Sequence, residues 1–487
     1  MRAEGIAGAS LPVWTRYGLA TGADARPGTL YASMSPETTF IRPAQRWLAP
    51  VLLVVGLASP PAATAGWRLE PIGGSEGVLG LHDLAFDTQG RGLLSWDAAL
   101  RGRVPPAFGG LATRDAAGGW QRPPDVAGVE PQSAQIHLYG QQRALLVGRE
   151  SQDGAAPGVS RRRLMAADGQ SDGGFGQLQT LDDFTIAAWS AVNRSGDAVV
   201  AWVGERSPFV RVAFRDGTRL AFASPRDLAI ASSAAVAVNP RGDAVLAFTT
   251  GKRLAARVRP AGGVWGPTIQ FGRFASTRDI RLSALFTRDR RIVVTWGGAR
   301  RSCGVAVRDG AESWDVERLE RRCGASAVGS RGAPVVPIAD SRGATYVAWT
   351  GPNRRGRSAV KLARIDSTGA RRPTVLSRLP GAKLDDVAAG PSGALAVTWT
   401  APRPTADKPY TMASFAVVRR GRGRFGEAER LSPASITVAH GSRVAFQPLT
   451  GEPVVAVPYA VGFTVAVGAA VGPAAPRPPV VLPTPQP

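Results

Sequence analysis

The sequence is poor in the residue types on which many enzymes depend. Its 487 residues include only two cysteines, three histidines and four methionines. It has no G-x-x-x-x-G-K-[ST] phosphate loop, no H-E-x-x-H motif, no EF-hand calcium loop, and no G-x-S-x-G elbow in a strand-to-helix setting. We therefore expect neither phosphate transfer nor zinc-protease chemistry, and nothing in the sequence indicates a cofactor.

The two cysteines are too few for a structural zinc site, which takes four ligands. They lie in one predicted hairpin, where Cys303 opens the first strand and Cys323 closes the second. Export to an oxidising compartment favours a bond between such a lone pair. We predict a structural disulfide, Cys303–Cys323.

Long apolar stretches are also lacking, because no run reaches the roughly 20 residues of a membrane-spanning helix. Residues 48–58 form an apolar run of 11 residues, which follows two arginines and precedes Ala63-Thr64-Ala65. This pattern is typical of a signal peptide cleaved after Ala65, and a start at Met34 would give it an ordinary length. We expect residues 34–65 to be a signal peptide and residues 1–33 to be a wrongly assigned upstream or disordered segment. The mature protein should be secreted or otherwise extracytoplasmic.

Negative charge is scarce relative to positive charge. The chain has 59 basic and 37 acidic residues, a net charge of +22, and only four of the bases are lysine. A GC-rich genome produces such an arginine bias, so codon usage is one interpretation. A selected surface that binds a polyanion is the other.

What the sequence does contain is a repeat. A short apolar strand, a tight turn with glycine and a strand that ends in an aromatic residue recur, as in SAVNRSGDAVVAWV (190–203) and IADSRGATYVAWT (338–350). Equivalent positions follow one another at steps of 46 to 58 residues, which is the period of a β-propeller blade. These positions are Trp96, Gly148, Trp202, Phe248, Trp296, Trp349, Trp399 and Val457.

A second, more polar hairpin follows each first one, and two hairpins make the four strands of a blade. The sequence thus predicts an all-β fold, an eight-bladed β-propeller of four-stranded antiparallel blades over residues 66–472, with seven blades as the alternative. The last unit has only three strands, whereas Trp67 opens an unpartnered strand near the mature N-terminus. We expect that strand to complete the last blade and close the ring. Residues 473–487 are rich in proline and are expected to form a disordered tail.

Two outer turns resemble the Asp-box of sialidase-like propellers. They are TRDAAGGW (113–120) and VRDGAESW (307–314), in which Asp115 and Asp309 precede the tryptophan by five residues. Both depart from the family by lacking glycine at its fifth position. The resemblance implies a propeller whose Asp-boxes are structural, and it transfers no catalytic residue, because the mature chain has no Arg-Ile-Pro motif.

Acidic residues recur where a loop leads from the outer strand of one blade to the inner strand of the next, at the mouth of the channel. Carboxylates there could hold a cation or act as an acid/base pair, and the alternative is that they are solvated loop residues or turn caps. The candidate catalytic residues are Asp83, Asp183, Asp279 and Asp386, with Asp182, Asp227 and Asp385 beside them.

The three histidines, His82, His137 and His440, lie near the first strands of blades 1, 2 and 8, which are neighbours in a closed ring. They are the candidate metal ligands. They stand at different distances from the repeated position, 14, 11 and 17 residues before it, so isolated surface histidines remain the alternative.

Two functions remain open at this point. The first is an extracytoplasmic binding or interaction propeller, expected to be a monomer, whose ligand is a glycan, another polyanion or a protein but not a specific nucleic acid. The second is a sialidase-like glycan hydrolase or lyase that uses carboxylates at the channel mouth.

Overall fold

The structure is a computed structural model, and every account below concerns the residues that it describes. These are residues 67–72, 78–98, 108–121, 134–152, 161–204, 207–219, 221–274, 280–298, 302–310, 313–321, 323, 335–366, 369–377, 379–402, 411–432, 441–459 and 462–469. The predicted signal peptide, the segment before it and the proline-rich tail all lie outside them. No helix in these ranges has the length and apolar character needed to cross a membrane.

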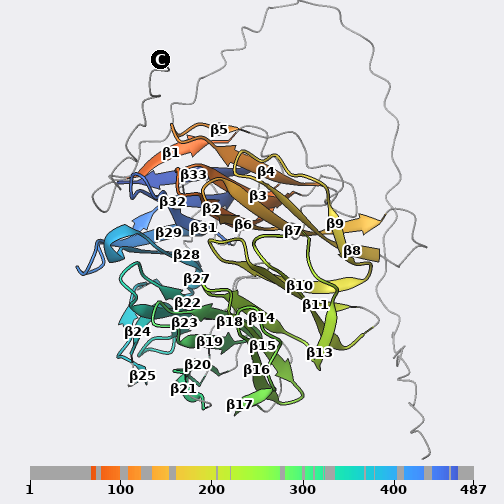
Figure 1. The fold of residues 1–487 in the computed structure, drawn as a ribbon. Helices are drawn as coiled ribbons and strands as arrows, with labels where there is room; N and C mark the ends of the chain where they lie inside the picture. The colour runs from red at the N-terminus through yellow and green to blue at the C-terminus, as the bar shows by residue number, and fades with distance from the viewer. Residues whose placement is uncertain are drawn as a thin grey trace, which may run out of the picture. The chain divides into compact units, whose positions relative to one another are not determined.

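The described strands form eight antiparallel sheets, the blades, which follow one another around a ring (Figure 1). Blade 1 contains β2 (Val78–Phe86), β3 (Gly92–Ala98), β4 (Phe108–Arg114) and β5 (Trp120–Gln121). Blade 2 contains β6 (Gln135–Tyr139), β7 (Arg143–Gln152), β8 (Arg161–Gln170) and β9 (Gln179–Asp182). Blade 3 contains β10 (Thr185–Val192), β11 (Ala198–Gly204), β12 (Phe209–Arg215) and β13 (Arg226–Ile230). Blade 4 contains β14 (Ala234–Val238), β15 (Ala244–Thr250), β16 (Arg253–Arg259) and β17 (Ile269–Arg273).

The second half of the ring repeats this arrangement. Blade 5 contains β18 (Arg281–Phe286), β19 (Ile292–Gly297), β20 (Cys303–Arg308) and β21 (Asp315–Glu320). Blade 6 contains β22 (Val335–Ala339), β23 (Thr345–Pro352), β24 (Ser358–Asp366), β25 (Gly369–Ala370) and β26 (Thr374–Val375), the last two sharing the outer position. Blade 7 contains β27 (Lys383–Ala389), the 3-10 turn η2 (Pro391–Gly393), β28 (Leu395–Pro402), β29 (Met412–Arg419) and β30 (Glu429–Arg430). Blade 8 contains β31 (Arg443–Phe446), β32 (Pro453–Tyr459), β33 (Gly462–Gly468) and, from the other end of the chain, β1 (Trp67–Pro71).

The second strand of each blade is buried on both faces, which explains its continuous apolar sequence. In β11 (AVVAWVG) all but one residue are buried, and the tryptophans that end the repeat, Trp202, Trp349 and Trp399, are at most 1% exposed. In blade 1 the neighbouring strand places Gly110 opposite Trp96, where a Cβ atom would lie 2.0 Å from the indole ring. The repeated aromatic is therefore a core residue of its blade.

The turn between the first and second strands is built in the same way in several blades. Asn193 accepts hydrogen bonds from the backbone N–H groups two and four residues later, and Asn239 and Asp340 do the same. The glycine of each turn has a positive φ, for example 91° at Gly242. Because L residues with side chains rarely adopt this conformation, the turn accounts for the fixed spacing of glycine in the repeat. We call the end of the ring that carries these turns the turn end, and the opposite end, where outer strands lead to inner strands, the connection end.

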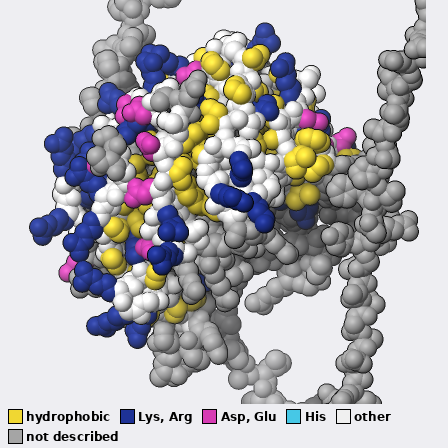
Figure 2. Space-filling model, turned by 90° about the horizontal axis from the view of Figure 1, so that it is seen from below, with side chains coloured by type: hydrophobic (Ala, Val, Ile, Leu, Met, Phe, Trp, Pro, Cys, Tyr) yellow, Lys and Arg dark blue, Asp and Glu magenta, His cyan; other side chains and the backbone are white. Residues whose placement is uncertain are grey.

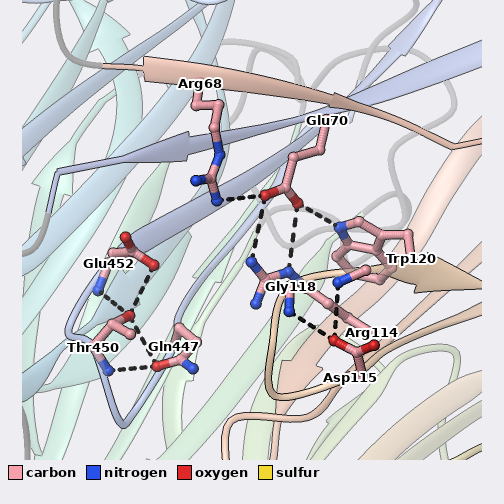
Figure 3. A network of polar contacts seen from close by, with 10 residues as sticks. Arg68, Glu70, Arg114, Asp115, Gly118, Trp120, Gln447, Thr450 and Glu452 are labelled. Carbon is pink, nitrogen blue, oxygen red and sulfur yellow. Dashed lines mark hydrogen bonds and ion pairs between the residues drawn. The ribbon is translucent and has the colours of Figure 1, made fainter.

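The N-terminal strand closes the ring, as the sequence predicts. β1 pairs with β33 along its whole length, from Trp67 opposite Gly468 to Pro71 opposite Thr464. Figure 3 shows how Glu70 of this strand also reaches blade 1: its carboxylate accepts hydrogen bonds from Arg114 and from Trp120 Nε1 at 3.0 Å. The last blade is thus tied to the first by side chains as well as by its borrowed strand.

Arginines at the ends of third strands repeat the same kind of contact between other blades. Arg215, which is 2% exposed, pairs with Asp168 of the preceding blade, and Arg419 pairs with Asp340 of the blade before it at 3.7 Å. Arg114 makes the corresponding contact across the ring closure. These buried arginines are therefore structural, and only the exposed ones are available to a partner. Figure 2 shows one face of the molecule, on which Lys and Arg side chains outnumber acidic ones and gather toward the left.

The disulfide between Cys303 and Cys323 is present, as predicted. Both cysteines are buried, and they join the start of β20 to the chain that follows β21. The bond therefore fixes the start of the chain segment that connects blade 5 to blade 6, at the connection end.

Candidate functional site

The connection end of the channel contains a cavity of about 810 Å³. Its wall is made mostly by the first residues of the inner strands, so it lies where the sequence predicted a channel mouth. All eight blades contribute to the wall, through Asp83, Gln135, Trp189, Ser233, Ser283, Val336, Asp386 and Arg443, in blade order.

Arg443 is the positive centre of this cavity. It begins β31, is 8% exposed, and donates from Nε to the carbonyl oxygen of His82 in blade 1 at 2.7 Å. Burial raises the pKa of three carboxyl groups, those of Asp83, Asp385 and Asp386, and the positive charge of Arg443 partly offsets the rise at each. Three acidic residues from blades 1 and 7 thus lie near one guanidinium group.

Asp83 and Asp386 are held by backbone donors of the neighbouring blades. Asp83 Oδ2 accepts a hydrogen bond from the Ile136 N–H at 3.2 Å, and Asp386 Oδ2 accepts one from the Val444 N–H at 3.1 Å. Burial nevertheless raises the pKa of both groups, and the charge of Asp83 raises the pKa of Asp386 further. The carboxyl group of Asp83 therefore lies close enough to Asp386 to affect its ionisation.

Asp385 is the most deeply buried of the three acids, with 4% exposure. Its Oδ2 accepts a hydrogen bond from the Thr400 hydroxyl. Burial raises the pKa of Asp385 to about 6, although Thr400, Arg443 and hydrogen bonds with Gly441 and Ser442 oppose the change. The cavity wall therefore holds a carboxyl group that changes charge near neutral pH.

The two histidines that the structure describes, His82 and His137, lie in different surroundings. His82 lines the cavity, whereas His137 accepts or donates a hydrogen bond at 2.7 Å with the Ser190 hydroxyl between blades 2 and 3. Burial lowers the pKa of His137 to about 4, so it is neutral at physiological pH. His440 lies outside the described residues, so the shared site stays a prediction. Among the residues described, no three His, Cys, Asp or Glu side chains are grouped to hold a metal ion.

The remaining acidic candidates lie away from the cavity wall. Asp183 is exposed and pairs with Arg163 at 3.2 Å, and Asp227 pairs with Arg211 at the same distance. Asp182, next to Asp183, is structural: it accepts hydrogen bonds from Trp202 Nε1 and from Arg211. Asp279 lies outside the described residues, and its assignment stays a prediction.

Sequence reasoning missed the central role of Arg443 and the depth at which Asp385 lies. The sequence does mark Arg443, because this charged residue opens an otherwise apolar inner strand, RVAF. It does not mark Asp385, because two adjacent aspartates do not reveal which of them is the more deeply buried. In β27 the register shifts between Leu384 and Asp386, and this bulge places both acids on the cavity wall.

The Asp-box-like turn of blade 1 is structural in this protein. Asp115 Oδ1 accepts hydrogen bonds from the N–H groups of Gly118 and Gly119 at 2.7 and 2.9 Å, within its own turn. Trp120 then turns inward to donate to Glu70. In the second such turn, Trp314 stacks on Phe271 of blade 4 at 4.3 Å between ring centroids.

Comparison with known proteins supports the architecture. No protein-family model matches the chain. No curated protein matches it. Among solved structures, the Dos1 propeller superposes with a TM-score of 0.51 at 10% identity, covering 84% of this chain and 97% of its own. An ulvan lyase, described as a new family of polysaccharide lyase, superposes with a TM-score of 0.44 at 10% identity, covering 83% and 96%. Likeness at this level of identity shows the propeller fold alone.

Proposed function

We propose that this protein is an extracytoplasmic binding propeller whose cavity at the connection end holds a glycan of the cell envelope or the environment. The observation that carries the proposal is the cavity itself, because all eight blades line it and most contribute polar side chains, whereas blade 3 contributes Trp189 and blade 6 Val336. Asp83, Asp386 and Arg443 offer acceptors and donors for sugar hydroxyls, and Trp189 offers an apolar face.

The experiment is a binding titration with neutral and acidic oligosaccharides, by calorimetry, on the wild type and two variants. Asp386→Asn should weaken binding about tenfold or more, because it removes a charged acceptor from the cavity wall. Asp183→Asn is the matched control, since that side chain is 61% exposed and paired outside the cavity. Equal affinity of all three proteins, or binding of a protein and no glycan, would contradict the proposal.

The location is tested separately. The disulfide Cys303–Cys323 supports an oxidising compartment. Edman sequencing of the exported protein should begin at Gly66, and a mature protein that retains residues 34–65 inside the cell would overturn this part.

A second candidate is a glycan hydrolase or lyase, favoured by two carboxyl groups, Asp83 and Asp386, on one cavity wall. Glycosidases use a pair of carboxyl groups as acid and base or nucleophile. Turnover of any member of a broad polysaccharide panel, lost in Asp386→Asn but kept in Asp183→Asn, would establish it. No turnover across the panel would leave binding as the function.

A further inference from the structure

The turn end of the ring carries exposed arginines at repeated positions. The turns between first and second strands present Arg194, Arg241, Arg288 and Arg342 from blades 3 to 6, and blade 7 adds Arg420 from its second hairpin. All five side chains are exposed. We call this set the arginine arc.

Neighbouring turns touch one another in blades 3 and 4 and again in blades 5 to 7. Asn193 donates a hydrogen bond to the Asn239 carbonyl oxygen at 2.8 Å, which joins the turns of blades 3 and 4. A Cβ atom on Gly343 would lie 3.4 Å from the Arg288 side chain, and one on Gly393 would lie 3.1 Å from that of Arg342. The arginine of one blade therefore lies against the turn of the next in blades 5 to 7.

No carboxylate in the described ranges lies within ion-pair distance of any arginine of the arc. The nearby acids are occupied. Asp289 pairs with Arg291 at 2.7 Å, and Asp197 and Asp243 accept hydrogen bonds from the backbone N–H groups of Gly217 and Ala261, each at 2.8 Å. The arc thus presents guanidinium groups that form no ion pair within the described residues.

The chemistry of the arc favours one class of polyanion. Arginine binds sulfate and carboxylate groups through paired, charge-assisted hydrogen bonds. Single-stranded nucleic acid also needs aromatic platforms on which bases stack, and none of the exposed large apolar side chains described lies in these turns. The disulfide points to an oxidising compartment, where acidic polysaccharides are the abundant polyanions. We propose that the arginine arc is a second binding site, for a linear polysaccharide that bears sulfate or uronate groups.

The test compares two triple variants that remove the same charge from opposite ends of the ring. Arg194→Gln, Arg241→Gln and Arg342→Gln together remove three of the five arginines of the arc, and the turns should survive because their hydrogen bonds use backbone N–H groups. The control triple replaces residues 354, 355 and 357, three exposed arginines in the turn between β23 and β24 at the connection end. The probes are dextran sulfate, polygalacturonate, uncharged dextran and duplex DNA.

We expect the arc triple to bind dextran sulfate or polygalacturonate at least about tenfold more weakly than the wild type. The slope of log Kd against log salt concentration should fall by about 2, since each lost contact is worth roughly 0.7 on the scale for single-stranded polyanions. The control triple should retain most of the affinity and slope. Equal losses in the two triples, no binding of either acidic polysaccharide by the wild type, or tighter binding of duplex DNA would each overturn the proposal.

The proposals for the arginine arc and for the cavity at the connection end can be tested independently of each other. Asp386→Asn should leave binding of the acidic polysaccharides unchanged, and the arc triple should leave binding in the cavity unchanged. A loss in both assays from either change would show that one site, rather than two, is present, and would overturn the arc as a separate site.

Discussion

Replacing Asp385 by asparagine should make the protein more stable at neutral pH. Asp385 is 4% exposed, and burial raises its pKa from the ordinary 3.8 to about 6. Between these two pH values the folded protein holds a proton that the unfolded chain has lost. Stability therefore falls as pH rises through this window, and above it the folded state carries the full cost of an ionised, buried carboxylate.

The size of the effect follows from the same two values. Each pKa unit corresponds to 1.36 kcal/mol, so the cost at pH 7 is about 3 kcal/mol for Asp385. Asparagine has nearly the same shape, can accept the hydrogen bond from the Thr400 hydroxyl, and cannot ionise. We expect Asp385→Asn to match the wild type near pH 4 and to exceed its free energy of unfolding by up to about 3 kcal/mol at pH 7.

The assay is urea unfolding followed by tryptophan fluorescence at pH 4, 5, 6 and 7, on the wild type and the variant. Asp183→Asn is the control, and its difference from the wild type should not change with pH, because that side chain is 61% exposed. A difference between wild type and Asp385→Asn that stays constant from pH 4 to 7 would refute the reasoning. So would a variant that is less stable at pH 7.

Three further predictions concern the ring. Glu70→Ala should lower the free energy of unfolding by about 3 kcal/mol, because it leaves a buried arginine without its carboxylate, whereas Arg68→Ala, at a 66% exposed side chain, should change it by less than about 0.5 kcal/mol. Arg290→Gly should raise it by about 1 kcal/mol, since Arg290 has a φ of 67° at the turn position that glycine occupies in other blades. Replacing Cys303 and Cys323 together by serine should lower it by about 3 kcal/mol, because the bond closes a loop of 20 residues. Urea unfolding measures all three.

Each of these predictions has an outcome that would contradict it. Equal effects of Glu70→Ala and Arg68→Ala would show that the contact across the ring closure is not stabilising. A destabilised Arg290→Gly would mean that the arginine side chain makes a contact worth more than the backbone strain. An unchanged protein after loss of both cysteines would mean that the connection from blade 5 to blade 6 is held by other contacts.

The blade architecture could be predicted because its determinants are local and periodic. The turn glycine, with its positive φ at Gly242, and the buried aromatic six residues later, at Phe248, recur at a fixed spacing that a sequence displays directly. The closure by β1 could also be predicted, because the last unit lacks one strand and Trp67 opens a strand without a partner. Both predictions depend on which strands pair through their backbones, and this pairing follows from the order of the strands in the sequence.

The site was harder to predict, because it depends on which side chains point toward the axis. Asp83 and Asp386 line the cavity at the connection end, whereas Asp183 is exposed in the connection between blades 2 and 3. Asp83 and Asp386 lie within the inner strands β2 and β27, each beside a register shift, whereas Asp183 lies before the inner strand β10 begins. Such differences leave no mark in the repeat. The function classes, and the metal site that needs His440, stay predictions.

The arginine content illustrates why net charge is a poor guide to partners. Codon usage alone would scatter arginine over exposed positions, yet Arg114, Arg215 and Arg419 end third strands and reach back to acids of the preceding blade. These charges are neutralised inside the ring and cannot attract a polyanion. Only arginines that are both exposed and unpaired within the described residues, such as Arg241 and Arg342, contribute to an external field. Any polyanion that binds this protein should therefore respond to those residues and not to the total charge of +22.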